Sequence, residues 1–446
     1  MNAALRPPFP RTTPLAACLA IALAIGSTSM PVLAANRVVQ NCGDGGMGSG
    51  SLRDMVGVAN SGDTIDLSQL PTKCALTDAV ITLMNGEIVM SQKDLTLQGP
   101  YAGTGTVAIS GNYTSRAFNH TGSGQLQILG LVVEEGYLRA DHSELGGCIT
   151  SNGEVLISNS TVTNCTAVSN LDFAWGGGVF AAGTVTLVNS EVSNNNVTAY
   201  SSGVGGGIAA SEGVIAKYST ISGNNAGGGL SSVGGGAAVV DSSASVGAVI
   251  RNSTIEGNSS GGDGGGLMIR GGNATIENST ISYNTSLMGS GGGVQGSGPE
   301  TISNSTISFN HAVSAGGINQ CCDISSLVLQ SSIIANNTDD TSVAADLYMH
   351  AGSILSGGNS LVTSTNINGA GVIVSTSDPK LAPLQFNGGL TRTHALLPGS
   401  PAIGNGNNAA GLATDQRGYP RTTGPNASVD IGAFQFDSIF VDAFEK

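Results

Sequence analysis

A pattern of glycines, polar residues and β-branched residues recurs seven times between residues 146 and 338. Each repeat opens with a glycine run and continues into a segment close to Asn-Ser-Thr-Ile-Ser-x-Asn. We take the first residue of each such segment as its anchor. The anchors lie 26–34 residues apart, at Asn159, Asn189, Tyr218, Asn252, Asn278, Asn304 and Gln330. A unit of this length cannot bury its apolar face alone, so the repeat predicts a solenoid of stacked coils.

The apolar residues of the repeats fall in two columns. The residue two before the anchor is always apolar, and the residue three after it is always β-branched. An odd separation would put the two columns on opposite faces of a straight strand, so the chain must turn a corner near the anchor. Gly, Asn, Ser and β-branched residues fill every unit, which argues against helices. Shorter apolar runs at 79–83, 95–97, 107–110 and 126–133 add coils upstream. The pattern predicts an all-β chain folded as a right-handed parallel β-helix of about ten coils.

The sixth position after the anchor is Asn in all repeats but the first, where Cys165 replaces it. Side-chain amides at stacked turns can hydrogen-bond from coil to coil. We therefore interpret this column as a structural ladder and not as a binding site. Its predicted members are Asn195, Asn224, Asn258, Asn284, Asn310 and Asn336.

The N-terminus has the order of a secretory signal. Arg6 and Arg11 precede an apolar run at 15–25, and Val32-Leu33-Ala34 is a plausible cleavage site. Residues 1–35 are therefore assigned to a signal peptide, with the mature chain starting near Ala35 or Asn36. The run is too short to span a bilayer comfortably, and no later segment reaches the necessary length. We expect a secreted or outer-surface protein with no transmembrane segment after signal cleavage.

The remaining chain divides into four parts by its pattern. We expect an N-terminal cap at 36–78, the β-helix at 79–375, a C-terminal segment at 376–436 and a sorting-tail-like end at 437–446. The longest coil lies at 236–252, where an unequal loop could carry function. The sequence leaves the oligomeric state open.

Six cysteines remain after the signal peptide, and an even number in an exported chain suggests disulfides. Cys148 replaces the third glycine of its coil and Cys165 the ladder Asn of the same coil, which favours a bond between them. The other pairs suggested by sequence proximity are Cys42 with Cys74 and Cys321 with Cys322. No Cys or His spacing indicates zinc, and we expect no metal site and no cofactor. Calcium would suit an acidic chain, but no calcium-binding motif supports it.

The charge of the chain narrows the classes of partner. The formal net charge is −14, only 10% of residues are charged, and 4% are aromatic. Such a field repels phosphate backbones, so we exclude nucleic acid as a partner. It is compatible with polysaccharides or other cell-envelope components, and it selects neither.

Catalysis on a glycan would need clustered groups: two carboxylates for hydrolysis, or a base with acidic ligands for a lyase. The repeats do not show such a cluster. One column stands out, because Lys217, Arg251 and Glu277 each precede the anchor on successive coils and should point outward and stack. We interpret it as a solvated ladder of charges. The alternative is a contact to an acidic sugar, or a lyase base.

Two further features have both structural and functional interpretations. Trp175 is the only tryptophan and is expected in a loop, where it would either cap the edge of the core or stack on a sugar. Arg417 and Asp430 lie near the end of the chain and are expected to form a structural ion pair that closes the last coils.

Several segments resemble known exported bacterial proteins. The run SLRDMVGVANSGDTIDL from Ser51 is similar to the CSLREA opening of such proteins, although Gly50 stands where that motif has its Cys. Near the other end, ALLPGSPAIGNGN, TDQRGYPR and VDIGAFQ resemble the choice-of-anchor Q domain, and the repeats resemble those of polymorphic outer-membrane proteins. The resemblance covers about residues 40–435 and implies a pectate-lyase-like β-helix at or outside the cell surface. The tail DSIFVDAFEK is similar to short IFxDGFE endings, but Ala443 replaces their usual Gly.

Three functions remain in view from the sequence. The favoured one is a secreted or surface β-helix that binds glycans or other macromolecules, adhesin-like and without catalysis. The alternative is a polysaccharide lyase or glycoside hydrolase acting on acidic polysaccharide. A purely structural or adhesive envelope component cannot be separated from the first by sequence.

Overall fold

The computed structural model describes residues 34–74, 78–101, 105–229, 231–241, 243–321, 325–340, 345–421 and 428–436. All but the last two residues of the predicted signal peptide, and all of the predicted tail 437–446, lie outside these ranges. Over the described residues, no helix is long and apolar enough to cross a membrane.

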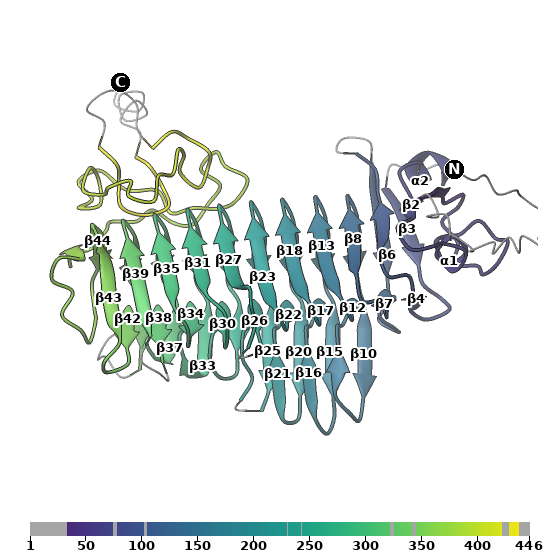
Figure 1. Ribbon diagram of the computed structural model, residues 1–446, viewed down its shortest axis with the longest axis horizontal. Helices are drawn as coiled ribbons and strands as arrows, with labels where there is room; N and C mark the ends of the chain where they lie inside the picture. Colours follow the sequence, from purple (N-terminus) through teal and green to yellow (C-terminus); the bar gives the residue numbers. More distant parts are fainter. Residues whose placement is uncertain are drawn as a thin grey trace, which may run out of the picture. The chain divides into compact units, whose positions relative to one another are not determined.

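The chain is all-β and folds as a right-handed parallel β-helix, which confirms the predicted fold class (Figure 1). Each strand pairs in parallel with a strand one coil away, so that strands far apart in sequence become neighbours. Three sheets, A, B and C, form the walls of the coil. Across the described ranges, sheets A and B hold twelve strands each and sheet C holds ten, close to the predicted number of coils.

Sheet A runs along the whole helix. Its strands are β1 (Asn36–Val38), β2 (Thr64–Asp66), β5 (Leu95–Gln98), β8 (Gln125–Leu129), β13 (Glu154–Ser158), β18 (Thr184–Val188), β23 (Gly213–Lys217), β27 (Gly247–Arg251), β31 (Ala274–Glu277), β35 (Glu300–Ser303), β39 (Ser326–Gln330) and β43 (Ile354–Gly358).

Sheet B follows sheet A within each repeat coil. Its strands are β3 (Asp78–Thr82), β6 (Thr106–Ser110), β9 (Val132–Glu134), β14 (Thr161–Thr163), β19 (Glu191–Ser193), β24 (Thr220–Ser222), β28 (Thr254–Glu256), β32 (Thr280–Ser282), β36 (Thr306–Ser308), β40 (Ile333–Ala335), β44 (Ser360–Val362) and β45 (Ile373–Ser375).

Sheet C precedes sheet A within each repeat coil. Its strands are β4 (Ile88–Met90), β7 (Phe118–His120), β12 (Ile149–Ser151), β17 (Val179–Ala181), β22 (Ile208–Ala210), β26 (Ala237–Val239), β30 (Leu267–Ile269), β34 (Val294–Gly296), β38 (Ile318–Gln320) and β42 (Leu347–Met349).

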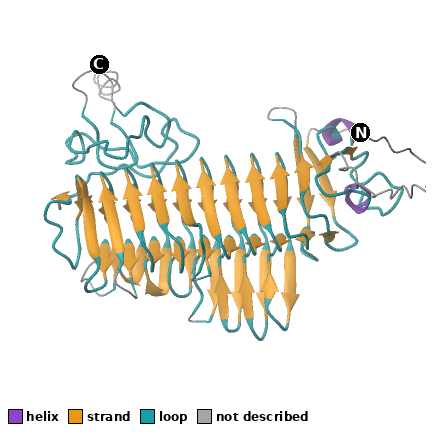
Figure 2. Cartoon of the chain, in the orientation of Figure 1, coloured by secondary structure: helices purple, strands orange, loops and turns teal. Residues whose placement is uncertain are grey.

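Two further sheets lie on the excursion of the chain from sheet B to sheet C (Figure 2). Sheet D contains β10 (Tyr137–Ala140), β15 (Thr166–Ser169), β20 (Asn196–Ala199), β25 (Asn225–Gly228), β29 (Ser259–Ser260), β33 (Thr285–Ser290), β37 (His311–Ser314) and β41 (Thr338–Asp339). Sheet E contains β11 (Glu144–Leu145), β16 (Phe173–Trp175) and β21 (Ser202–Val204).

The corner between sheets A and B explains the odd spacing of the two apolar columns. The anchors Asn159, Asn189, Asn252, Asn278 and Asn304 all have a positive φ of 46–51°. Asn tolerates this left-handed conformation better than most residues because its side chain can hydrogen-bond locally. The turn redirects the chain, so that the inward columns of both sheets join one continuous core.

The Asn ladder is present, with one correction. From Asn195 to Asn310, each side-chain amide donates to the side-chain oxygen of the next ladder residue at 2.9–3.0 Å. The ladder then continues through Asn337, at 2.9 Å from Asn310, and not through the predicted Asn336. Asn336 instead occupies the turn, with φ 60°. The last repeat is shifted by one residue, because Ser331 (φ 44°) turns the corner one position after the predicted anchor Gln330.

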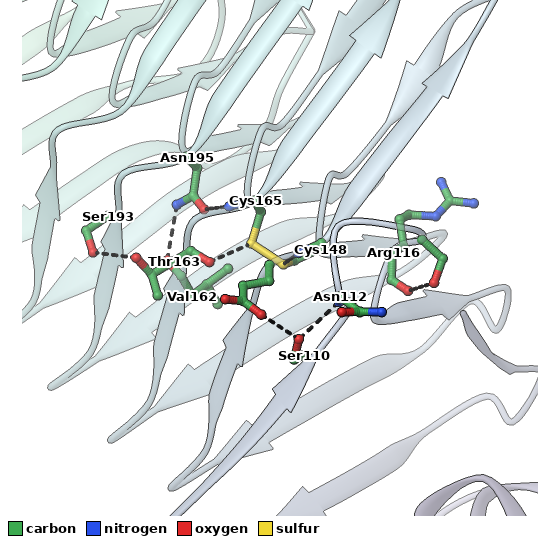
Figure 3. Close-up of a disulfide and its surroundings, with 12 residues drawn as sticks. Ser110, Asn112, Arg116, Cys148, Val162, Thr163, Cys165, Ser193 and Asn195 are labelled. Atoms are coloured by element: carbon green, nitrogen blue, oxygen red, sulfur yellow. Dashed lines mark hydrogen bonds between the residues drawn. A yellow bond between two sulfur atoms is a disulfide. The ribbon is translucent and has the colours of Figure 1, made fainter. Parts of the chain in front are cut away.

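Two of the predicted disulfides are confirmed. Cys42 bonds to Cys74 and Cys148 bonds to Cys165, with Cα–Cα distances of 6.3 and 5.4 Å. Figure 3 shows Asn195 beside the second bond, where its side-chain oxygen accepts the backbone N–H of Cys165 at 3.0 Å. The disulfide therefore stands at the start of the ladder. Cys321 is also disulfide-bonded, but Cys322 lies outside the described residues, so that pairing stays a prediction.

Two segments flank the repeats. Residues 36–78 include helices α1 (Leu52–Gly57) and α2 (Leu70–Lys73), together with β1 and β2, which already belong to sheet A. The C-terminal segment, residues 376–421 and 428–436, forms isolated bridges without extended strands. It lies along the β-helix beside the coils from β27 to β44 (Figure 1).

Candidate functional site

Sheet B presents a row of polar side chains on its outer face. In its three-residue strands the middle residue is buried in the core, as at Val162, Val192 and Ile221. The first and third residues alternate with it and therefore face outward. From β9 to β28 most of these outward residues carry a hydroxyl or a carboxyl group: Glu134, Thr161, Thr163, Glu191, Ser193, Thr220, Ser222, Thr254 and Glu256.

The C-terminal segment covers the continuation of this face. Thr254, Thr280 and Thr306 are at most 1% exposed because that segment lies on them. Thr254 donates to the carbonyl of Arg392 at 2.7 Å, and Thr306 accepts the backbone N–H of Ala433 at 3.1 Å. Farther along, Ile333 and Leu361 form an apolar cluster with residues of the segment. The same face is thus covered in one half and open in the other.

A cavity of about 330 Å³ lies where the open face meets the C-terminal segment. We call it the sheet-B cavity. Its walls are Glu191, Asn194, Thr220, Ser222, Gly223, Glu256 and Gly257 from the coils, and Phe386 and Arg392 from the segment. The volume falls at the lower end of the range for small-molecule sites, about 300–1,000 Å³.

A short hairpin holds Phe386 and Arg392 at this edge. Gln385 and Thr393 pair as an antiparallel bridge, and the amide of Asn387 inside the turn donates to the carbonyl of Thr393 at 2.9 Å. The buried amide of Gln416 fastens the hairpin, because its nitrogen reaches the carbonyl of Arg392 at 3.0 Å and the hydroxyl of Thr254 at 3.0 Å. The ring of Phe386 is 62% exposed.

The charges of the cavity come from one ion pair and one further carboxylate. Arg392 lies 3.3 Å from Glu256, and its guanidinium carbon lies 5.3 Å from the centre of the Phe386 ring. Burial raises the pKa of Glu256, an effect that Arg392 opposes and the negative charge of Glu191 reinforces. Glu191 is exposed and has no salt bridge to any described residue. Its carboxylate is therefore available to accept hydrogen bonds.

This set of groups suits a ligand with many hydroxyls. Carboxylates accept hydrogen bonds from such a ligand, and hydroxyls both donate and accept them. An exposed aromatic ring can stack on the apolar face of a sugar. Within the described part of the chain, no group of three or more His, Cys, Asp or Glu residues is placed to hold a metal ion.

The predicted charge column lies elsewhere. Lys217, Arg251 and Glu277 are in register on adjacent strands of sheet A, and Arg251 pairs with Glu277 at 2.7 Å. The geometry of the column is as expected, but it shares no wall with the sheet-B cavity.

Trp175 and Arg417 also require corrections. Trp175 lies in strand β16 and not in a loop, and its ring packs 5.8 Å from that of Phe180 beside a buried apolar cluster. Arg417 pairs with Asp415 at 2.7 Å, and its guanidinium carbon lies 3.6 Å from the centre of the Phe434 ring. Asp430 instead accepts backbone N–H groups, from Gly404 at 2.7 Å and from Phe436. The expected ion pair between Arg417 and Asp430 is wrong.

Sequence reasoning missed the residues of the cavity for two reasons. Glu191 and Glu256 occupy the second and fourth positions after their anchors, where most repeats have Thr or Ser. The replacement of Thr or Ser by Glu is visible in the sequence. The two glutamates lie on coils separated by a third, however, so they do not form one column of neighbours. Phe386 and Arg392 belong to an irregular segment, and only the folded chain brings them to sheet B.

Comparison with known proteins adds only distant likenesses. No family model and no curated protein matches the chain. Among solved structures, pectate lyase Pel9A matches with a TM-score of 0.46 and 13% identity, over 90% of this chain and 96% of that one. A PL6 alginate lyase in complex with a trisaccharide matches with a TM-score of 0.30 and 11% identity, over 89% and 97%. Likenesses this distant indicate nothing about the activity of this chain.

Proposed function

We propose that this protein is an exported β-helix that binds a neutral glycan on the open face of sheet B, without cleaving it. The observation that carries the proposal is the sheet-B cavity, which combines an exposed ring at Phe386, free acceptors at Glu191 and hydroxyls at Thr220 and Ser222. Export agrees with the disulfides Cys42–Cys74 and Cys148–Cys165, since such bonds persist in oxidising compartments.

The charge of the site favours a neutral ligand over an acidic one. Glu191 and Glu256 both face the cavity, and the single cation there, Arg392, is already paired with Glu256. A uronate would be repelled by the unpaired carboxylate and by the acidic chain as a whole. Neutral sugars are not repelled by these negative charges, and their hydroxyls can donate charge-assisted hydrogen bonds to the carboxylates.

One observation favours a second candidate, a glycoside hydrolase. Glu256 is a partly buried carboxyl with a raised pKa near a second carboxylate, as a general acid requires. Against this, Arg392 at 3.3 Å stabilises the ionised form of Glu256, which is the wrong form for an acid. We therefore favour binding, and the experiment below separates the two functions.

The test is a binding screen with purified protein starting at Asn36. Amylose, laminarin, galactan, mannan and xylan would be compared with pectate and alginate, with and without calcium, and reducing ends would be measured in parallel. We expect one neutral polysaccharide to bind without release of reducing ends. Phe386→Ala should weaken that binding about tenfold, equivalent to about 1.4 kcal/mol, through loss of stacking.

Arg251→Ala provides the matched control, because this arginine lies on sheet A away from the cavity and should leave binding unchanged. Release of reducing ends that Glu256→Gln abolishes would establish the hydrolase instead. Binding to pectate or alginate that depends on Arg251 would overturn both readings of the cavity.

A further inference from the structure

We infer that the sheet-B cavity receives the end of a linear glycan chain and not an internal stretch of it. This inference rests on the proposed function and adds the part of the ligand that is recognised. It follows from the way in which one side of the cavity is closed and the opposite side continues along sheet B.

The closed side is formed by the C-terminal segment. Beyond the cavity, the outward residues Thr254, Thr280 and Thr306 are 0–1% exposed beneath that segment. Their hydroxyls are used in contacts with it: Thr254 with the carbonyl of Arg392, Thr280 with the side chain of Gln416, and Thr306 with the backbone of Ala433. No space on this face remains for a ligand to continue from β28 to β32.

The open side extends in the opposite direction along the stack. The outward residues Thr220, Thr161 and Glu134 are partly exposed, and Glu191 is exposed. The open side consists of four strands, β24, β19, β14 and β9. Measured from β28 to β9, it spans four strand spacings, or about 19 Å. We call the outer face of these four strands the open strip. A chain of several sugar rings could lie along it and reach the cavity.

The width of sheet B favours this orientation of the chain. The strands of the open strip are three residues long, so the strip is only about 7–10 Å wide. If a glycan lay parallel to the strands, only one or two of its sugar rings would contact the strip. A glycan lying across the strands contacts hydroxyls and carboxylates of successive coils, and its leading ring then meets Phe386 and Arg392. Because the C-terminal segment covers the next position along the stack, we place this ring at the end of the chain.

The test uses the neutral polysaccharide that binds in the screen, size-fractionated into preparations of known mean chain length. Isothermal titration calorimetry gives the number of protein molecules bound per chain. Because the two ends of a glycan differ chemically, we expect one protein per chain at every length. A number that rises in proportion to chain length would show internal binding and overturn the inference while leaving the proposed function intact.

Two variants locate the bound chain on the protein. With short linear oligosaccharides of the same glycan, Thr220→Trp in the wall of the cavity should weaken binding at least tenfold at every length. Thr161→Trp, farther along the open strip, should weaken binding only of oligosaccharides long enough to reach it. Equal effects of both variants at every length would contradict the proposed placement. Absence of binding to all glycans would overturn the proposed function, and this inference with it.

Discussion

The guanidinium of Arg392 lies 3.3 Å from the carboxylate of Glu256, a residue 136 positions earlier in the chain. This contact joins the C-terminal segment to β28 at the boundary between the covered and open halves of sheet B. The same guanidinium lies over the ring of Phe386. One side chain therefore contacts both the partly buried carboxyl and the aromatic ring of the cavity.

Replacing Arg392 by Ala should change the pH dependence of glycan binding. The positive charge of Arg392 lowers the pKa of Glu256, so its removal should raise that pKa further. If the ionised carboxylate accepts hydrogen bonds from the glycan, the loss of binding on acidification should then begin at a higher pH. Calorimetric dissociation constants between pH 4 and pH 8 would measure the shift.

Arg392→Lys is the control for that experiment, because it keeps the charge and should keep the original midpoint. The pair is partly exposed, so we expect its loss to change folding stability by less than about 1 kcal/mol. An unchanged midpoint in Arg392→Ala would show that Glu256 takes no part in binding.

The buried side chain of Glu300 should make the protein less stable as the pH rises. Glu300 lies in an inward column of sheet A between Ala274 and Leu327, and neither carboxyl oxygen has a hydrogen-bond partner among the described residues. Burial raises its pKa to about 8. Between pH 4.5 and pH 8 the folded state therefore holds a proton that the unfolded state has lost, and stability should fall by about 1.4 kcal/mol per pH unit.

Urea unfolding at pH 5 and pH 8 would measure this effect. Glu300→Gln keeps the shape and cannot ionise, so the variant should be more stable than the parent at pH 8 and show a smaller difference between the two pH values. Glu277→Gln, on a partly exposed residue of the same sheet, is the matched control. An unchanged pH dependence in Glu300→Gln would contradict the assignment.

The Cys148–Cys165 disulfide should be replaceable by the pair found in the next coil. There, Gly178 stands beside Asn195, and a side chain on Gly178 would lie 3.0 Å from the Asn195 amide carbon. The double variant Cys148→Gly with Cys165→Asn should thus extend the Asn ladder by one step. We expect it to recover part of the stability lost in Cys148→Ala with Cys165→Ala, a loss of about 2–4 kcal/mol.

Thermal unfolding under oxidising conditions would compare the two double variants with the parent. Equal stability of the two variants would mean that the ladder adds nothing at this coil. The control is the other described disulfide, in the N-terminal segment before the ladder begins. The stability lost in Cys42→Ala with Cys74→Ala should not be restored by ladder residues.

If the chain is cleaved at the predicted site after Ala34, the new N-terminus should form an ion pair. The backbone nitrogen of Ala35 lies 2.7 Å from Asp63, whose carboxylate is fully buried and also pairs with Arg37 at 2.6 Å. Although burial alone would raise the pKa of Asp63, hydrogen bonds from Asn60, Ala35 and Arg37 lower it. A free α-amino group at Ala35 would therefore face an ionised carboxylate.

We expect protein starting at Ala35 to be about 1–2 kcal/mol more stable at pH 7 than the same chain acetylated at that residue. The pair raises the pKa of the amine, so the gain should be complete below pH 7 and lost as the pH rises beyond about 8. Denaturant unfolding of both forms at pH 6, 7 and 9.5 would measure it. A gain that persists at pH 9.5 could not come from this ion pair.

The fold was predictable because each coil repeats its neighbour, so that seven aligned repeats reveal which positions face the core. The single error of register arose where Ser331 and Ser332 follow each other, since a Ser matches the column at either position. Only the positive φ of Ser331 shows which of the two turns the corner. The Cys148–Cys165 disulfide was predictable for the same reason as the fold, because both cysteines broke the consensus of a single coil.

The cavity was less predictable because its parts obey no common period. Glu191 and Glu256 could be assigned to the outer face of sheet B from their repeat positions. No pattern indicates that Phe386 and Arg392 reach that face. Their position depends on tertiary contacts such as those of Gln416, which lies within the TDQRGYPR motif. The C-terminal motifs thus contain residues that attach the C-terminal segment to the β-helix. They give no indication of the sheet-B cavity that this attachment forms.

The C-terminal segment also alters how the solenoid should come apart. Coils of a β-helix ordinarily contact only their neighbours, so unfolding can begin at either end and proceed coil by coil. Here the segment bonds to Asn252, Asn278, Ser331 and Asn359, residues of four different coils. These coils cannot separate one at a time unless the C-terminal segment, which bonds to all four, also detaches. Amide hydrogens in β28–β44 should therefore exchange together, in one cooperative opening, whereas those in β9–β19 can exchange through smaller, independent openings.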